Sequence, residues 1–210
     1  MAMSFRDWLA KCPLIAILRG VRPDEVEAVA EALAGQGIAI VEVPLNSPDP
    51  VTSICRLAAR FGTRLLIGAG TVMTADEVAK VAAAGGRLIV TPHAAGDVVR
   101  AAKARGMLAC PGIFTPTEAF AMLAAGADAL KLFPAEAASP AVLRAMRAVL
   151  PAGTALLPVG GIDAGSTRPW REAGAAGFGI GSAIYKPGDD AARVGEKAAA
   201  LLAALQDWQD

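Results

Sequence analysis

The feature that most constrains the fold of this 210-residue chain is a regular alternation of strand-like and helix-like segments. Eight short segments are apolar on both faces, as parallel strands covered by helices should be, and they recur roughly every 20 to 26 residues. Between them lie amphipathic, alanine-rich stretches such as Asp24–Ala34, Ala75–Ala84 and Pro140–Leu150. The pattern predicts an α/β protein with these strands: Leu14–Arg19, Ile38–Leu45, Leu65–Val72, Leu88–Pro92, Met107–Gly112, Ala129–Phe133, Ala155–Gly160 and Phe178–Ile184.

Eight strand–helix units in one chain of this length indicate a (β/α)8 barrel that forms a single domain over residues 1–210. A doubly wound sheet uses the same local pattern and remains an alternative. The segment Phe5–Lys11, within residues 4–11, is predicted to form a short helix that closes the bottom of the barrel. The segment Asp190–Trp208 is predicted to form the last helix.

Composition and charge exclude several classes of function. The net charge is zero and there is no basic block, so nucleic acid is not an expected partner. Glycine, proline or a charged residue interrupts every long apolar run, so no membrane span is expected. The first residues carry Arg6 and Asp7 and lack an apolar signal core, which predicts a cytoplasmic protein. The three widely spaced cysteines are expected to be buried free thiols rather than disulfides or metal ligands: Cys12, Cys55 and Cys110.

The most informative single residue is Lys131, which interrupts the apolar run from Ala129 to Pro134. Burial disfavours the charged ammonium and lowers the pKa of a lysine, and a neutral amine is a nucleophile toward a ketone or aldehyde. Lys131 is therefore a candidate for Schiff-base catalysis. The alternative is a lysine at the end of a strand whose ammonium reaches water.

Further polar residues fall at the carboxyl ends of the predicted strands, where barrels of this kind place their active sites. Glu42 on the second strand could transfer protons in imine chemistry, or it could pair with Arg19. Arg19 could instead bind a substrate carboxylate. Thr71 follows a Gly-Ala-Gly segment whose backbone could hold a second anionic group, and His93, the only histidine, is expected at the rim of a loop.

The ends of the last two strands resemble a phosphate site. Gly160 and Gly161 follow the seventh predicted strand, and Gly181 and Ser182 follow the eighth. Glycine lets backbone N–H groups approach an anion closely, and the serine hydroxyl adds a donor. Barrels commonly bind phosphate at these two loops, which predicts a substrate with a phosphate at one end. Two tight turns in a glycine-rich chain are the alternative.

Several motifs, in this order, resemble the KDPG/KHG aldolase family, which acts on 2-dehydro-3-deoxy-6-phosphogluconate (KDPG) and 4-hydroxy-2-oxoglutarate (KHG). The resemblance runs from Pro13 to about Pro187. It implies a homotrimeric barrel with class I, metal-independent chemistry and no cofactor. Its motifs are Val41-Glu42-Val43-Pro44-Leu45-Asn46-Ser47-Pro48, Leu66-Ile67-Gly68-Ala69-Gly70-Thr71-Val72, Ile89-Val90-Thr91-Pro92, Leu130-Lys131-Leu132-Phe133-Pro134 and Val159-Gly160-Gly161-Ile162.

Within the family, the chain looks most like the branch that acts on 2-dehydro-3-deoxy-6-phosphogalactonate (KDPGal). Asn46 and Val159 fall on the galactonate side, where the gluconate branch more often has arginine and threonine. Glu136, in Pro134-Ala135-Glu136, looks more like the gluconate branch.

The resemblance implies a class I aldolase that releases pyruvate and D-glyceraldehyde 3-phosphate, with Lys131 and Glu42 as its catalytic residues. The implied substrate-binding residues are Arg19, Asn46, Thr71, Pro92, Val159, Gly160, Gly161, Gly181 and Ser182. KDPG or KHG aldolase activity is the first alternative. A phosphosugar isomerase or synthase, or a barrel that only binds phosphorylated sugars, is a more remote one.

Overall fold

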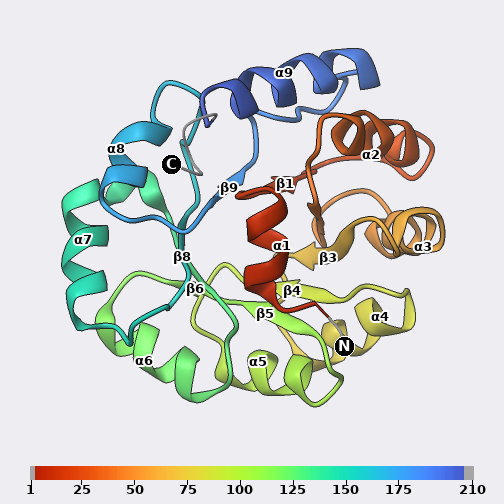
Figure 1. Ribbon diagram of the computed structural model, residues 1–210. Coiled ribbons are helices and arrows are strands. Elements are labelled where there is room, and N and C mark those ends of the chain that lie inside the picture. Colours follow the sequence, from red (N-terminus) through yellow and green to blue (C-terminus); the bar gives the residue numbers. More distant parts are fainter. Residues whose placement is uncertain (1–2, 206–210) are drawn as a thin grey trace.

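The computed structural model describes residues 3–205 and consists of parallel strands surrounded by helices (Figure 1). The predicted alternation is confirmed, because each of the eight predicted segments contains a strand. The observed strands are shorter than predicted, since the apolar residues at their ends continue into the loops.

Six strands form the larger sheet, in the order β5-β4-β3-β2-β1-β9. Every pair of neighbours is parallel, and Ile17 of β1 lies opposite Glu42 of β2. The strands are β1 Leu14–Ile17, β2 Ile40–Pro44, β3 Leu66–Gly70, β4 Leu88–Val90, β5 Leu108–Cys110 and β9 Phe178–Ile180.

Three strands form the smaller sheet, in the order β6-β7-β8, and they are also parallel: β6 Gly112–Ile113, β7 Leu130–Leu132 and β8 Leu156–Pro158. The predicted strand Met107–Gly112 is divided between β5 and β6 at Pro111, since proline has no N–H for the strand ladder. A parallel bridge from Val159 to Gly179 joins the end of β8 to β9. The parallel α/β architecture is thus confirmed. The expected continuous eight-stranded barrel is not, because the described strands form two sheets.

Helices cover the outer face of the strands (Figure 1). Two of them, α4 and α6, begin with capping boxes in which Thr74 pairs with Glu77 and Thr115 pairs with Glu118. These pairings satisfy N–H groups that would otherwise lack acceptors. The helices are α2 Val26–Gly35, α3 Pro50–Phe61, α4 Ala75–Ala83, α5 Gly96–Lys103, α6 Pro116–Ala124, α7 Pro140–Val149, α8 Thr167–Glu172 and α9 Ala191–Ala203, with a short 3-10 helix η1 at Ala135–Ala137.

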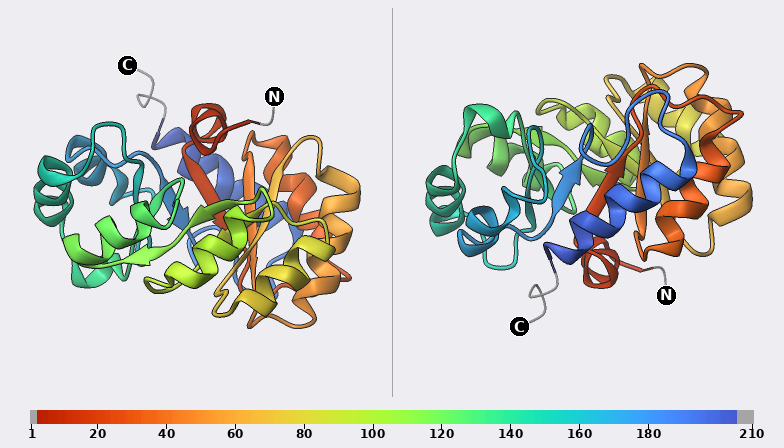
Figure 2. Two further views of the ribbon diagram at one scale, coloured as in Figure 1. Left: turned by 90° about the horizontal axis from the view of Figure 1, so that it is seen from below. Right: turned by 90° about the horizontal axis from the view of Figure 1, so that it is seen from above.

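The first helix, α1 (Phe5–Lys11), lies across one end of the ring of strands (Figures 1 and 2). It buries Phe5, Trp8 and Leu9, which confirms the predicted position of this helix. The predicted last helix is observed as α9, with Asp190 as its N-cap. The end of that prediction, residues 206–208, lies outside the described residues.

The apolar core includes residues from both sheets and from the covering helices. Cys12 and Cys110 are buried free thiols, as predicted, but Cys55 is exposed. That part of the prediction is wrong because Cys55 lies on α3, whose buried face is formed by Ile54 and Leu57.

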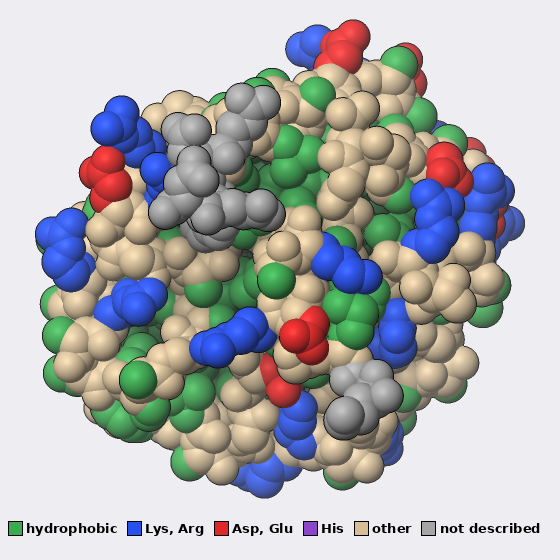
Figure 3. Space-filling model, viewed as in Figure 1, with side chains coloured by type: hydrophobic (Ala, Val, Ile, Leu, Met, Phe, Trp, Pro, Cys, Tyr) green, Lys and Arg blue, Asp and Glu red, His purple; other side chains and the backbone are tan. Residues whose placement is uncertain are grey.

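Lys/Arg and Asp/Glu side chains are interspersed on the face that carries α1 (Figure 3). Among the described residues, no helix is both long enough and apolar enough to cross a membrane.

Candidate active site

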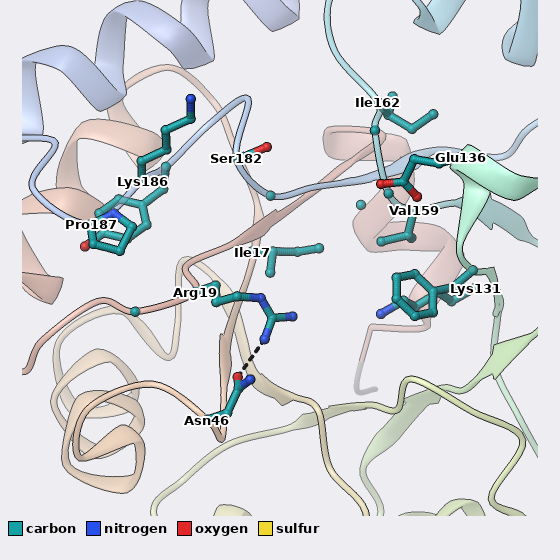
Figure 4. Close-up of a pocket in the computed structure, with 17 residues that line it drawn as sticks. Ile17, Arg19, Asn46, Lys131, Glu136, Val159, Ile162, Ser182, Lys186 and Pro187 are labelled. Atoms are coloured by element: carbon teal, nitrogen blue, oxygen red, sulfur yellow. Dashed lines mark hydrogen bonds between the residues drawn. The ribbon is translucent and has the colours of Figure 1, made fainter.

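A cavity of about 440 Å³ lies where the chain leaves the carboxyl ends of β1, β2, β7, β8 and β9 (Figure 4). It lies at the end of the strands opposite α1, because α1 leads directly into the start of β1. Most of the predicted site residues line it: Arg19, Asn46, Lys131, Val159, Gly160, Gly161, Gly181 and Ser182.

Lys131 reaches the cavity from the middle of β7, where Leu130 and Leu132 are fully buried. Only 6% of Lys131 is exposed, and its Nζ lies 4.5 Å from the centre of the Phe133 ring. Burial lowers the pKa of Lys131, and the negative charge of Glu42 partly opposes this effect. Within residues 3–205 the ammonium has no ion-pair partner in direct contact. The amine is therefore easier to deprotonate than that of a surface lysine.

Glu42 lies in β2 and is 2% exposed, and this predicted catalytic residue is not among the residues that line the cavity. Burial raises the pKa of this carboxyl to about 7, although the charges of Lys131 and Arg19 lower it. One oxygen, Oε2, has no hydrogen-bond partner among the described residues. A carboxyl with a pKa near neutrality can both accept and release a proton at physiological pH.

The Gly-Ala-Gly segment of β3 makes room for this carboxyl. A Cβ on Gly70 would collide with the Glu42 carboxylate, and a Cβ on Gly68 would collide with the backbone oxygen of Leu88. Glu42 lies opposite Gly68 in the ladder between β2 and β3, and its carboxylate packs against the backbone of Gly70, two residues further along β3. Gly68 and Gly70, which suggested an anion site in the sequence, therefore leave space for neighbouring groups of the protein itself.

Arg19 is exposed at the rim and donates from Nη1 to Asn46 Oδ1 at 2.6 Å. A second bond joins the same two loops, because Gly20 N donates to Ser47 Oγ at 2.9 Å. Within residues 3–205 Arg19 forms no ion pair with Glu42, although its charge lowers the pKa of that carboxyl. Arg19 and Lys131 extend toward the cavity from opposite sides (Figure 4).

The predicted phosphate cradle lies in the loops that follow β8 and β9, and its four residues line the same cavity as Arg19 and Asn46. Gly160 and Gly161 have φ of +108° and +65°, which side chains rarely adopt. Among the described residues, no acceptor is found for the backbone N–H groups of Gly161, Gly181 and Ser182. Unpaired N–H groups at two adjacent loops can bind an anion.

Other predicted residues lie outside the cavity wall. Thr71 and Pro92 are partly buried but do not line the cavity, and His93 is exposed and does not line it either. Thr71 has φ of +55°, an uncommon conformation for a residue with a side chain. The backbone of Pro92 packs closely against Gly112, because a Cβ on Gly112 would lie 2.6 Å from the Pro92 carbonyl oxygen.

Sequence reasoning missed three cavity residues with polar side chains, namely Glu136, Tyr185 and Lys186. Tyr185 donates from its hydroxyl to Glu25 Oε1 at 2.9 Å, at the start of α2. In the sequence, the Pro134-Ala135-Glu136 motif indicates only a similarity to the gluconate branch. The position of Glu136 five residues after Lys131, just past Pro134, was the feature of the sequence that could have indicated that it lies at the cavity.

The carboxylate and histidine groups do not gather elsewhere in a way that suggests a metal centre. Among residues 3–205, no group of three or more His, Cys, Asp or Glu side chains could hold a metal ion.

Comparison with known protein families matches residues 6–196 to the model described as KDPG and KHG aldolase. The chain belongs to the KDPG and KHG aldolase family. This confirms the resemblance seen in the sequence motifs.

Individual members of the family support the assignment over nearly the whole chain. The 2-dehydro-3-deoxy-6-phosphogalactonate aldolase of Escherichia coli (strain K12) is 44% identical over 200 residues, covering 95% of this chain and 98% of the relative. A solved structure described as "Native KDPGal structure" has a TM-score of 0.92 and 45% identity, covering 94% of this chain and 96% of that chain.

A more distant member bears on the chemistry. The solved structure of the KDPG aldolase from Legionella pneumophila holds pyruvate captured at low pH as a covalent carbinolamine intermediate. Its TM-score is 0.79 at 27% identity, and the match covers 96% of both chains.

Proposed function

We propose that this protein is a class I aldolase that cleaves KDPGal to pyruvate and D-glyceraldehyde 3-phosphate. The observation that carries the proposal is the pair Lys131 and Glu42, a buried amine in the cavity wall and a buried carboxyl close enough for their charges to interact. Each influences the pKa of the other, which is typical of groups that exchange protons during a reaction.

The reaction begins with Lys131 Nζ, which attacks the C2 carbonyl of the substrate. Loss of water then gives a protonated Schiff base. This iminium accepts electrons, so the C3–C4 bond breaks when the C4 hydroxyl gives its proton to Glu42. The aldehyde leaves and an enamine remains. Glu42 returns the proton to C3, and water hydrolyses the imine to release pyruvate and free Lys131.

The polar groups of the cavity wall suit the two ends of such a substrate. Arg19 lies at the rim with a guanidinium that suits a carboxylate, and the proposal assigns it to the pyruvate end, whereas Thr71 lies outside the cavity wall and is given no contact with the substrate. The phosphate is assigned to the N–H groups around Gly160, Gly161, Gly181 and Ser182. Binding at the distant phosphate holds the reacting bond in place over Lys131.

The nucleophile is tested by trapping. Incubation with pyruvate and borohydride should attach a reduced pyruvyl group to Lys131, identified by peptide mass, and a chelator should not prevent it. An adduct on another lysine, or loss of turnover in the chelator, would contradict class I chemistry at this site.

The preference for KDPGal over KDPG rests on Asn46 and Val159, both in the cavity wall. Arg19 already hydrogen-bonds to Asn46, so an arginine at position 46 would place two cations side by side and redirect Arg19. We expect kcat/KM for KDPGal to be at least that for KDPG. Val159→Thr should shift the ratio toward KDPG, and adding Asn46→Arg should shift it further. A clear wild-type preference for KDPG would refute the substrate assignment but not the aldolase assignment.

The architecture and assembly are part of the same proposal. We infer that the two sheets belong to one closed barrel and one domain, because the Val159–Gly179 bridge joins β8 to β9 and one core includes both sheets.

We also propose a homotrimer, supported by the exposed apolar side chains of Met73, Phe114 and Phe120. Native mass should equal three chains. A cytoplasmic location stays a prediction.

A further inference from the structure

The carboxylate of Glu136 lies against the glycine turn that is expected to bind phosphate. A Cβ on Gly160 would collide with the Glu136 carboxylate, and a Cβ on Gly161 would lie 2.6 Å from Glu136 Cγ. Glu136 extends from η1 toward Val159 and the turn that follows it (Figure 4). An acidic group therefore occupies the immediate surroundings of an anion cradle.

Nothing in the described structure neutralises this charge. Within residues 3–205 the Glu136 carboxylate has no hydrogen-bond or ion-pair partner, and the side chain is exposed. An exposed side chain without a partner can change rotamer at little cost in free energy. The N–H groups of Gly161, Gly181 and Ser182, in contrast, have no acceptor among these residues. The Glu136 carboxylate can thus move, whereas the N–H groups of the cradle are held in place by the backbone.

We propose that Glu136 is a specificity-determining residue that competes with the substrate phosphate for the Gly160–Gly161 turn. This inference rests on the proposed function and deepens it. The carboxylate must swing away from the turn before a phosphate dianion binds there. The phosphorylated ligand therefore binds less tightly than the backbone N–H groups alone would allow, whereas the reaction of Lys131 with pyruvate, which carries no phosphate, is unaffected.

The size of the effect follows from the two charges. A carboxylate and a phosphate dianion about 5 Å apart in a solvent-exposed site repel enough to weaken binding by about threefold to tenfold once salt screens them. Removing the charge while keeping the side-chain size should recover this factor. The gain should shrink at high salt, because the interaction is exposed.

The first test measures binding of inorganic phosphate by titration calorimetry at pH 8, using wild type, Glu136→Gln and a control. Glu196→Gln is the matched control, because it removes one negative charge from the exposed surface of α9, outside the cavity wall. Glu136→Gln should bind phosphate about threefold to tenfold more tightly than wild type and Glu196→Gln. Equal or weaker binding in Glu136→Gln, or no phosphate binding in either protein, would overturn the proposal.

The second test separates this proposal from the aldolase assignment. KM for the phosphorylated substrate should fall in Glu136→Gln, and trapping of pyruvate on Lys131 should proceed at the wild-type rate. Altered trapping with unchanged KM would mean that Glu136 acts on the reacting end, which overturns the proposal. If wild type fails to cleave the substrate but the phosphate result is obtained, the proposed function fails and the role of Glu136 in the cradle stands.

Discussion

Glu42→Gln should make the protein more stable while it abolishes most of its activity. Burial raises the pKa of Glu42 from 4.5 to about 7. Because the folded-state pKa lies above the unfolded one, the fold binds this proton more tightly than the unfolded chain does. The stability contribution is fully present below pH 4.5, and it is lost as pH rises through 7. Glutamine keeps the shape of the side chain and removes the cost of burying a charge.

The magnitude follows from the pKa difference. At about 1.4 kcal/mol for each pH unit between the two pKa values, an ionised Glu42 costs about 3 kcal/mol above pH 7. Only a small part of this cost is present at pH 5. The gain in unfolding free energy from Glu42→Gln should therefore be about 2–3 kcal/mol larger at pH 8 than at pH 5. Turnover at pH 7 should fall by roughly 10²–10⁴-fold, the span usual for general acid–base catalysis.

Urea unfolding at pH 5, 6, 7 and 8 measures the first effect, and steady-state turnover at the same pH values measures the second. Glu196→Gln on α9 is again the control, and its stability should follow that of wild type across the pH range. A stability difference between Glu42→Gln and wild type that is the same at every pH would refute the reasoning about burial. Near wild-type turnover would leave Glu42 without a role in proton transfer.

Three further substitutions test other parts of the site. Gly70→Ala should displace the Glu42 carboxyl and lower kcat by at least tenfold in turnover assays, whereas Gly35→Ala on α2, which has open space around it, should not. Lys131→Arg should abolish turnover and pyruvate trapping, since a guanidinium stays protonated. Gly181→Ala adds a methyl group where nothing lies within 4 Å, so thermal unfolding should be nearly unchanged. That methyl group should raise KM for the phosphorylated substrate roughly tenfold by narrowing the cradle.

The sequence alone determined the order of elements and indicated the two residues to which the proposal assigns the chemistry. Runs such as Leu130–Leu132 are apolar on both faces, which is a local property that needs no tertiary information. A threonine followed three residues later by a glutamate, as in Thr74 and Glu77, marks a helix start in the same way. Lys131 was identified because a charged residue in such a run is energetically costly.

The tertiary structure decided which side chains meet across the cavity. Arg19 and Asn46 are 27 residues apart, and nothing in either loop indicates that they bond. Glu136 likewise contacts the Gly160–Gly161 turn, and the Glu42 carboxylate packs against Gly70. Each of these contacts joins segments that are far apart in the sequence. Periodicity reports only the face on which a side chain lies. Its contacts depend on how the strands are placed beside one another, and long-range packing fixes that placement.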